Sequence, residues 1–298
     1  MSKISTTSED TLIHKITQNL TTQPEIITGV GDDCAVIAKT LDEHTLLKTD
    51  TIVESVHFLS AENPQRIGWK AAARVISDFA AMGGKPEALL VTIILPPETE
   101  LAWIENLYLG LNAVAEKYHC SIVGGETSST AAGSPKVISI SGTGTVTPEH
   151  LTLRSAAKPS DLIFVTGRLG GSIQGKHLDF APRVAEAQWL VNHCKPSSMM
   201  DLSDGLAKDL PRLADQSQCG FKITQEDLPR NSNCSIEQAL NDGEDYELLF
   251  SIPADQKSIL TDGWCNMFKN LELTQIGHFT ENKNDSLLGG WDHFMKHS

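Results

Sequence analysis

Segments typical of strands and of helices alternate along this chain, and the alternation restricts the folds open to it. The stretches 88–96 (ALLVTIILP), 136–146 (KVISISGTGTV) and 246–252 (YELLFSI) have the apolar, β-branched character of strands. Ahead of the first of them, apolar residues recur every four positions from Ile67 to Phe79, as on the inner face of a helix. The pattern predicts an α/β or α+β fold.

Several local expectations are specific. Ser8 is expected to cap a helix with an apolar face. A helix from Leu101 to Tyr118 is expected to turn Leu101 inward. The stretch 121–127 (SIVGGET) is interpreted as a short strand that runs into a glycine turn.

A mixed, polar stretch divides the chain near its middle. With 298 residues the chain is long enough for one large or two ordinary domains. Because residues 148–160 (PEHLTLRSAAKPS) break the regular pattern, we place a boundary there. The predicted domains are residues 1–148 and 149–298, both of mixed helix and strand.

Charge and cysteine usage limit the partners. The chain has 38 acidic and 24 basic residues and a net charge of −14, which disfavours nucleic acid and anionic membranes as partners. An anionic ligand would need a bridging divalent cation. The six cysteines are scattered without a CxxC pair, and no apolar signal core or run of 18 apolar residues occurs. We therefore expect a reduced, cytoplasmic location without membrane attachment.

Carboxylates recur where apolar segments end. They occur in GDD, KTD, ISDFAAMGG, GGET and DLSDG, and comprise Asp32, Asp33, Asp50, Asp78, Glu126, Asp201 and Asp204. For any one of them a turn or a helix cap is the simpler interpretation, and Asp78 is equally suited to a helical ion pair with Arg74. Their recurrence in five separate places favours a Mg²⁺ site on loops at one edge of a sheet.

Other polar positions are less specific. The stretch 170–177 (GGSIQGKH) nearly matches a phosphate-binding loop, but His177 replaces the required hydroxyl residue, which argues against one. His57 fits a packed core histidine as well as a functional one. Arg154, at the predicted boundary, suits a phosphate, although a surface arginine is commoner. Trp291 suits either packing or stacking on a heterocycle.

Several motifs, taken in their order along the chain, resemble one family. They are GDDCAVI, KTDTIVESVHF, ISDFAAMGGKP, GGETSS, LTLRSAAKPSD, VTGRLGGS, DLSDGL, GEDYELLF and the GWDHF near the end. Together they are similar to the thiamine-monophosphate kinases and cover nearly the whole chain. The resemblance implies a two-domain fold like that of aminoimidazole ribonucleotide synthetase.

The resemblance also implies partners and site residues. The N-terminal domain would bind ATP and several Mg²⁺ ions and form a homodimer with strands joined across the interface. The implied metal ligands are Asp33, Thr49, Asp50, Asp78, Glu126, Asp201 and Asp204. The implied nucleotide contacts are Gly125, Glu126, Arg154 and Ser203. The implied thiamine phosphate contacts are His57, Glu244 and Trp291.

Two positions depart from the pattern of that family. Glu126 stands where an aspartate is usual and reaches one methylene further. Lys48 stands where a small hydroxyl residue is usual. If that position contributes only backbone oxygen, the lysine is tolerated. If its side chain bound metal, the site loses a ligand, and a lysine there is also suited to a phosphate.

The implied reaction converts ATP and thiamine monophosphate into ADP and thiamine diphosphate. The acceptor is a phosphate monoester with a second pKa of about 6, so its oxygen is already ionised near neutral pH. We therefore expect direct in-line transfer assisted by Mg²⁺, with no residue assigned as general base. Two alternatives stay open at this stage: a nucleotide- and metal-binding protein without catalysis, and an ATP-dependent synthetase of the purine type.

Overall fold

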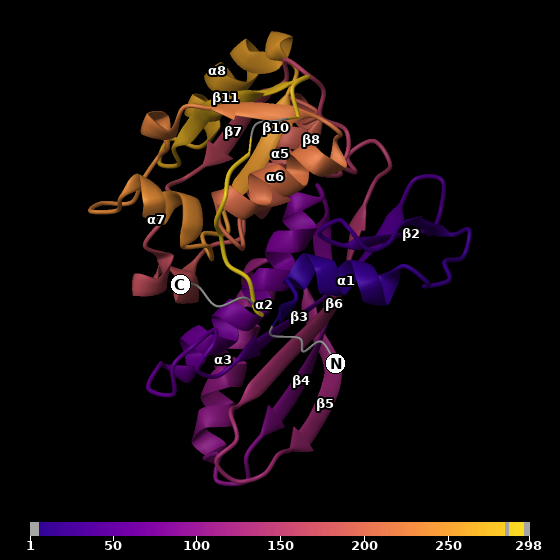
Figure 1. Cartoon of the computed structure of the whole chain (residues 1–298). Helices are drawn as coiled ribbons and strands as arrows, with labels where there is room; N and C mark the ends of the chain where they lie inside the picture. Colours follow the sequence, from indigo (N-terminus) through magenta and orange to yellow (C-terminus); the bar gives the residue numbers. More distant parts are fainter. Residues whose placement is uncertain (1–5, 284–285, 295–298) are drawn as a thin grey trace.

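A computed structural model of the chain describes residues 6–283 and 286–294. Two sheets of different strand order make up its framework, one in each half of the sequence. The first half, indigo to magenta in Figure 1, lies below the second half, orange to yellow. In both halves helices pack on the sheets, so the expected mixture of helix and strand is confirmed.

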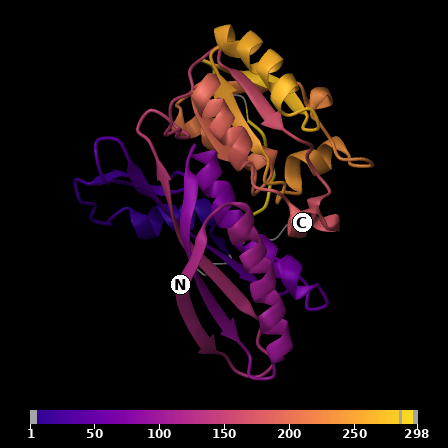
Figure 2. The same cartoon turned by 180° about the vertical axis from the view of Figure 1, so that it is seen from behind.

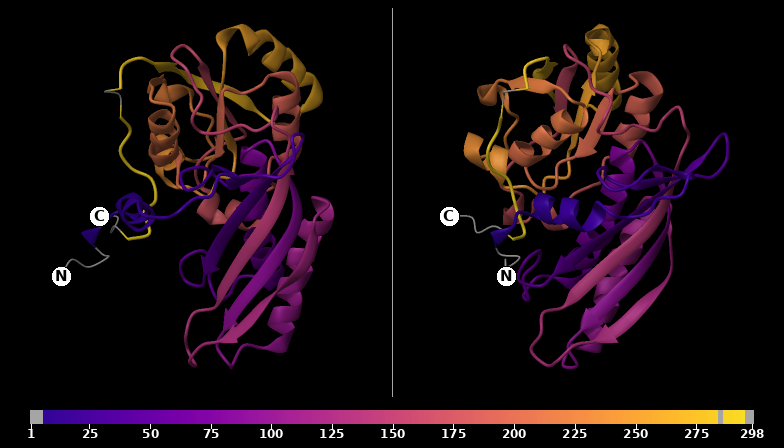
Figure 3. Two further views of the ribbon diagram at one scale, coloured as in Figure 1. Left: turned by 90° about the vertical axis from the view of Figure 1, so that its right-hand side faces the viewer. Right: turned by 45° about the vertical axis from the view of Figure 1, so that its right-hand side comes forward.

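The first sheet has six strands in the order β1-β2-β3-β6-β4-β5. Its strands are β1 (Ile26–Thr28), β2 (Ala35–Ala38), β3 (His44–Val53), β4 (Lys85–Leu95), β5 (Ser121–Ser129) and β6 (Val137–Val146). Only β4 and β5 pair in parallel, and the other neighbours are antiparallel. One face carries helices and the other is open, as is common for antiparallel sheets (Figure 3, left).

The second sheet has five strands in the order β8-β10-β7-β11-β9, all antiparallel. Its strands are β7 (Leu162–Thr166), β8 (Ser198–Asp201), β9 (Gly220–Ile223), β10 (Leu248–Ile252) and β11 (Leu273–Thr280). Every residue of β8 and β10 is buried, which explains why β10 (LLFSI) is mostly apolar without alternation.

The helices differ widely in length. They are α1 (Glu9–Thr17), α2 (Pro64–Ala81), α3 (Leu101–Lys117), α4 (Lys176–Asp179), α5 (Val184–His193), α6 (Leu206–Gln216), α7 (Ile236–Asn241) and α8 (Lys257–Met267). Short 3-10 turns occur at η2 (Ser172–Gln174), η3 (Gln225–Asp227) and η4 (Ala254–Gln256). Within the described ranges, none of these helices combines the length and apolar character that a membrane crossing needs.

Helix α2 connects the two halves of the protein. The side chain of Asn63 caps its first turn, and proline at position 64 suits a helix start. Its expected apolar face is fully buried against the first sheet, and its other side contacts α5 and β8 of the second half. Figure 2 shows α2 and α3 side by side, which is possible because glycine at position 68 lets the backbones approach closely.

Three local expectations need correction. Strand β5 does not end at Gly124 and Gly125: after a register shift at Val123, both glycines pair with β4, so no glycine turn forms. Leu101, expected to face inward, is 69% exposed at the first residue of α3. Ser8 caps α1 as expected, but no residue of that helix is buried.

The predicted division at residues 148 and 149 falls in the connection between the two sheets. The last strand of the first sheet ends at Val146 and the first strand of the second begins at Leu162. The independence of the two parts stays a prediction, and the outermost residues of both predicted domains, 1–5 and 295–298, lie outside the described residues.

Candidate active site

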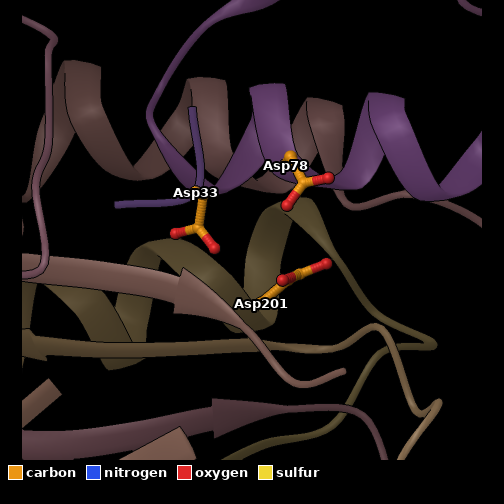
Figure 4. A group of neighbouring side chains, drawn as sticks. All are labelled: Asp33, Asp78 and Asp201. Atoms are coloured by element: carbon orange, nitrogen blue, oxygen red, sulfur yellow. The ribbon is translucent and has the colours of Figure 1, made fainter. Parts of the chain in front are cut away.

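Three carboxylates from distant parts of the chain meet between the two sheets. Asp33 lies in the loop before β2, Asp78 in the last turn of α2, and Asp201 at the end of β8. All three are buried, and one oxygen from each lies within 4.8 Å of the other two. In Figure 4 the side chains converge on one space. We call Asp33, Asp78 and Asp201 the acid cluster.

The acid cluster concentrates like charge in a buried place. Burial, and then the charge of Asp33, raise the pKa of Asp201 to about 7. Burial also raises the pKa of Asp78 well above its ordinary value; Lys48 opposes this increase and Asp50 adds to it. A cation bound between these groups would favour their ionised forms.

Two basic side chains partly compensate this charge. The Arg154 guanidinium lies 2.5 Å from Asp33 Oδ1. The Lys48 ammonium lies 2.8 Å from Asp78 Oδ1 and 3.9 Å from Asp50 Oδ1. Each basic group thus bonds one member of the acid cluster, Arg154 bonding Asp33 and Lys48 bonding Asp78.

The donor set suits a hard divalent cation. All three groups of the acid cluster offer carboxylate oxygen, which Mg²⁺ prefers, and no thiolate belongs to the cluster. Burial is the main cause of the raised pKa of Asp201, and the nearby charge of Asp33 adds to it, as expected for buried carboxylates that lie close together. These residues could therefore hold Mg²⁺.

A cavity of about 720 Å³ has in its wall Arg74, one helical turn before Asp78, and Ser203, which follows Asp201 closely in the chain. His57, Glu244 and Trp291, expected from the resemblance to contact thiamine phosphate, all line it. Further carboxylates in its wall come from Asp204, Glu237 and Asp242. The structure therefore brings the three expected residues into one space, while their role as substrate contacts stays a prediction.

A buried lysine holds one wall of this cavity. Lys70 of α2 is fully buried, and its ammonium lies 2.7 Å from Glu244 Oε1 and 2.7 Å from His177 Nδ1. Burial lowers the pKa of Lys70 to about 8 even though Glu244 acts to raise it. Although burial acts to raise it, the contacts with His177 and Lys70 lower the pKa of Glu244 to about 2. Glu244 therefore faces the cavity as a carboxylate.

His57 forms another part of the same wall. Its Nδ1 accepts a hydrogen bond from the backbone N–H of Val53. Burial, and then the nearby Arg74, lower the pKa of His57 to about 4. The ring is therefore neutral at pH 7 and, with Nδ1 occupied, carries its proton on Nε2.

Arg74 connects the cavity with the acidic residues. Its guanidinium lines the cavity, and its Nε lies 3.6 Å from Asp50 Oδ2. One Nη donates to the carbonyl of Thr51, while Nε is buried without a hydrogen-bond partner. The alternative pairing of Arg74 with Asp78 is not found among the described ion pairs, because Lys48 contacts that carboxylate instead.

Three predicted residues lie away from the acid cluster. The side chains of β3 alternate, so Lys48 and Asp50 face the helices, whereas Thr49 points to the open face and bonds Ser141. Gly125 and Glu126 lie on the edge strand β5, three strands from β3, or about 14 Å at 4.8 Å per strand. Within one chain the structure does not bring Glu126 to the acid cluster.

Asp204 and Ser203 belong to the cavity wall. Asp204 Oδ2 lies 2.6 Å from Arg212 Nη1 and 3.2 Å from Lys208 Nζ. Burial acts to raise the pKa of Asp204, but Arg212 and Lys208 lower it overall. The carbonyl of Ser203 accepts from the N–H of Glu244. The roles of Asp204 as a metal ligand and of Ser203 as a nucleotide contact stay predictions.

The glycine-rich stretch 170–177 forms no long helix with a phosphate-binding loop before it. It folds into η2 and the short α4. Its lysine, Lys176, lies 3.1 Å from the buried Glu247, and His177 contacts Lys70. These contacts agree with the interpretation from the sequence that residues 170–177 are not a phosphate-binding loop.

Sequence reasoning missed Lys70, and it treated Arg74 only as a partner for Asp78. The signal for Lys70 was a lysine beside the apolar stripe of a helix, at a position that also fits an exposed side chain. Its function in the fold became visible only through contacts with residues more than one hundred positions away.

The fold is that of the AIR synthase-related proteins. The family model described as AIR synthase related protein, N-terminal domain, matches residues 31–146. Thiamine-monophosphate kinase of Bacillus subtilis is 32% identical, with 93% of both chains covered. That of Rhodopirellula baltica is 37% identical, covering 80% of this chain and 79% of the relative.

The chain belongs to the thiamine-monophosphate kinase family. A solved structure of AaThiL complexed with AMPPCP and TMP agrees with this assignment. It superimposes with a TM-score of 0.85 at 28% identity, covering 98% of this chain and 99% of that chain. The AIR synthase-like fold expected from the resemblance is thus confirmed, while the division into two domains stays a prediction.

Proposed function

We propose that this chain transfers the γ-phosphoryl group of ATP to thiamine monophosphate, giving thiamine diphosphate and ADP. Its family supports the proposal, as does the complex of its structural relative with AMPPCP, an analogue of ATP, and TMP. The observation in this chain that carries it is the position of Arg74, whose guanidinium lines the cavity and lies beside Asp50. A phosphate bound to Arg74 would therefore lie next to the acidic residues.

The cavity suits the organic part of thiamine monophosphate. Thiamine carries a cationic thiazolium ring, and the cavity wall contains Glu244, ionised at neutral pH, together with the aromatic rings of Tyr246 and Trp291. The neutral His57 offers a hydrogen-bond donor. We propose that these groups orient the substrate while Arg74 binds its phosphate in a charge-assisted contact.

We further propose that Asp33, Asp78 and Asp201 hold Mg²⁺, with Asp50 and the backbone of Thr49 beside them. When bound, Mg²⁺ would offset the negative charge of the two phosphate groups that must approach each other. Arg154 and Lys48 hold Asp33 and Asp78 in their positions. Asp204 would join only after releasing part of its contact with Arg212 and Lys208.

The chemical step needs no strong base. An oxygen of the acceptor phosphate, ionised near neutral pH, attacks the γ-phosphorus of ATP. The new P–O bond forms as the bond from that phosphorus to the β-phosphate oxygen breaks, and ADP leaves with the electron pair. The residues of this chain contribute by positioning both phosphates in line and by excluding water.

We also propose a homodimer. The edge strand β5 is exposed along nearly its whole length, and the open face of the first sheet carries Leu47, Leu90 and Val123 in exposed positions. A second copy would cover this edge and face. It would also bring the β5 residues Gly125 and Glu126, which lie three strands from β3 in their own chain, toward a nucleotide bound by the partner.

A cytoplasmic location agrees with the cysteines, all six of which are free. Nothing in the cavity or the acid cluster requires an oxidising compartment, and we retain this location as part of the proposal.

The test is turnover of ATP with thiamine monophosphate and Mg²⁺, measured as thiamine diphosphate formed. Reactions with free thiamine, and without Mg²⁺, serve as controls. We expect product only from the monophosphate and only with the metal. ATP binding without turnover on any acceptor would favour a non-catalytic nucleotide-binding protein, and activity on a ribonucleotide would favour a synthetase.

A further inference from the structure

Lys48 occupies an unusual place for a lysine on a sheet. Its side chain points from β3 toward α2, on the helix-covered side, and is 22% exposed. The residues on either side of it, Leu47 and Thr49, are exposed on the open face. A shift of the register of β3 by one residue would have turned the lysine toward solvent. Its orientation toward the acidic residues therefore follows from the register of the strand.

The ammonium of Lys48 stands between two carboxylates. It lies 2.8 Å from Asp78 and 3.9 Å from Asp50, which project from different elements. Asp78 is also a member of the acid cluster. Lys48 donates a hydrogen bond to one of its two oxygens. A divalent ion binding Asp50 and Asp78 together would need the space that the ammonium fills, because Mg²⁺ requires its oxygen ligands at about 2.1 Å.

We propose that Lys48 acts as a built-in monovalent cation, replacing one divalent ion between Asp50 and Asp78. This inference rests on the proposed function, since it concerns the metal requirement of the same site. The contacts of Lys48 with Asp78 and Asp50 put its ammonium where such an ion would lie. The nucleotide-free chain then binds a divalent ion at the acid cluster and none between Asp50 and Asp78.

The test counts bound Mn²⁺, a spectroscopic substitute for Mg²⁺, by electron paramagnetic resonance and calorimetry. Wild-type protein without nucleotide should bind one ion per chain. Lys48→Met should bind a second ion or bind Mn²⁺ at least about tenfold more tightly, because a positive charge next to the site is gone. Lys48→Arg keeps the charge and should behave as wild type.

Lys39→Met is the matched control. It also removes one lysine from the first sheet region, but that lysine is exposed, and its ion pair among the described residues is with Glu43. Its Mn²⁺ stoichiometry and affinity should equal those of wild type. The comparison separates a local effect of Lys48 from the change in net charge.

Several results would overturn the inference. Two or more ions bound by nucleotide-free wild-type protein would do so even if Lys48→Met failed to fold. Unchanged Mn²⁺ binding by Lys48→Met, together with about tenfold weaker AMPPCP binding, would make Lys48 a phosphate contact. No Mn²⁺ bound by wild type even with AMPPCP would refute the metal-assisted function itself, and the inference with it.

Discussion

The acid cluster and the neighbouring cavity are built in different ways. The cluster is small, buried and dominated by charge, and its members stand at or near the ends of regular elements. The cavity is larger, partly exposed and of mixed character, and its wall draws on loops and on the C-terminal segment around Trp291. A change in the cluster alters charge at a fixed place, whereas a change in the cavity removes one contact among many.

This difference predicts separate kinetic consequences. Residues of the cluster act where charge is redistributed in the transition state, so their loss should lower kcat. Residues of the cavity bind parts of the substrate that do not react, so their loss should mainly raise KM. Arg74 stands at the junction and tests where the two regions meet.

The largest effect is expected for Asp201→Asn. It should lower kcat by about a thousandfold, because one carboxylate of the acid cluster loses its charge. The pKa of Asp201 is raised to about 7, so the folded state binds the proton more tightly and loses stability as pH rises from about 4 to 7. The variant avoids this loss, and at pH 8 without metal its Tm should rise by about 3 °C. A kcat within tenfold of wild type would show that the acid cluster has no catalytic role.

A smaller effect is expected for Arg74→Met. KM for thiamine monophosphate should rise about thirtyfold, since a hydrogen-bonded charge contact to phosphate contributes roughly 2 kcal/mol. Steady-state kinetics with saturating ATP measure it. Arg168→Met, which changes an exposed arginine paired with Glu272, is the control and should leave KM unchanged. An unchanged KM for Arg74→Met would show that Arg74 does not bind the substrate phosphate and does not connect the cavity with the acidic residues.

Lys70→Met should raise KM about tenfold, because Glu244 loses its lysine partner and keeps only the contact with His177 among its described ion pairs. The pKa of Lys70 is lowered to about 8, so the wild-type ammonium loses its charge as pH rises through 8. Affinity for thiamine monophosphate should therefore fall between about pH 7 and 9 in wild type and stay level in the variant. Lys70→Arg should restore affinity and remain charged through this range. A KM profile of wild type that is flat over this range would contradict a positioning role.

The smallest effect is expected for Trp291→Leu. KM should rise about threefold with kcat unchanged, because Trp291 is 39% exposed and forms only one part of the cavity wall. Trp103→Leu, at a tryptophan that packs over Lys136 away from this cavity, is the matched control. A fall in kcat with constant KM would mean that the C-terminal segment acts on the chemical step.

The sequence by itself determined the elements and the kinds of site residue. Four-residue spacing in α2 and continuous apolar character in β10 are local consequences of burial, and they predicted these elements well. Carboxylates at the ends of apolar segments indicated a metal site, because ligand-binding residues often lie on the loops at strand ends. The motif order was specific enough to indicate the family.

Only the tertiary structure decided which of these residues meet. Asp33, Asp78 and Asp201 converge because α2 lies between the two sheets, and no local pattern encodes that position. The strand register turns Thr49 away and Lys48 toward the acidic residues, although they are neighbours in sequence. Ion pairs such as Lys70 with Glu244 join residues far apart in the chain, and electrostatic energy depends on that distance in space, which sequence spacing does not supply.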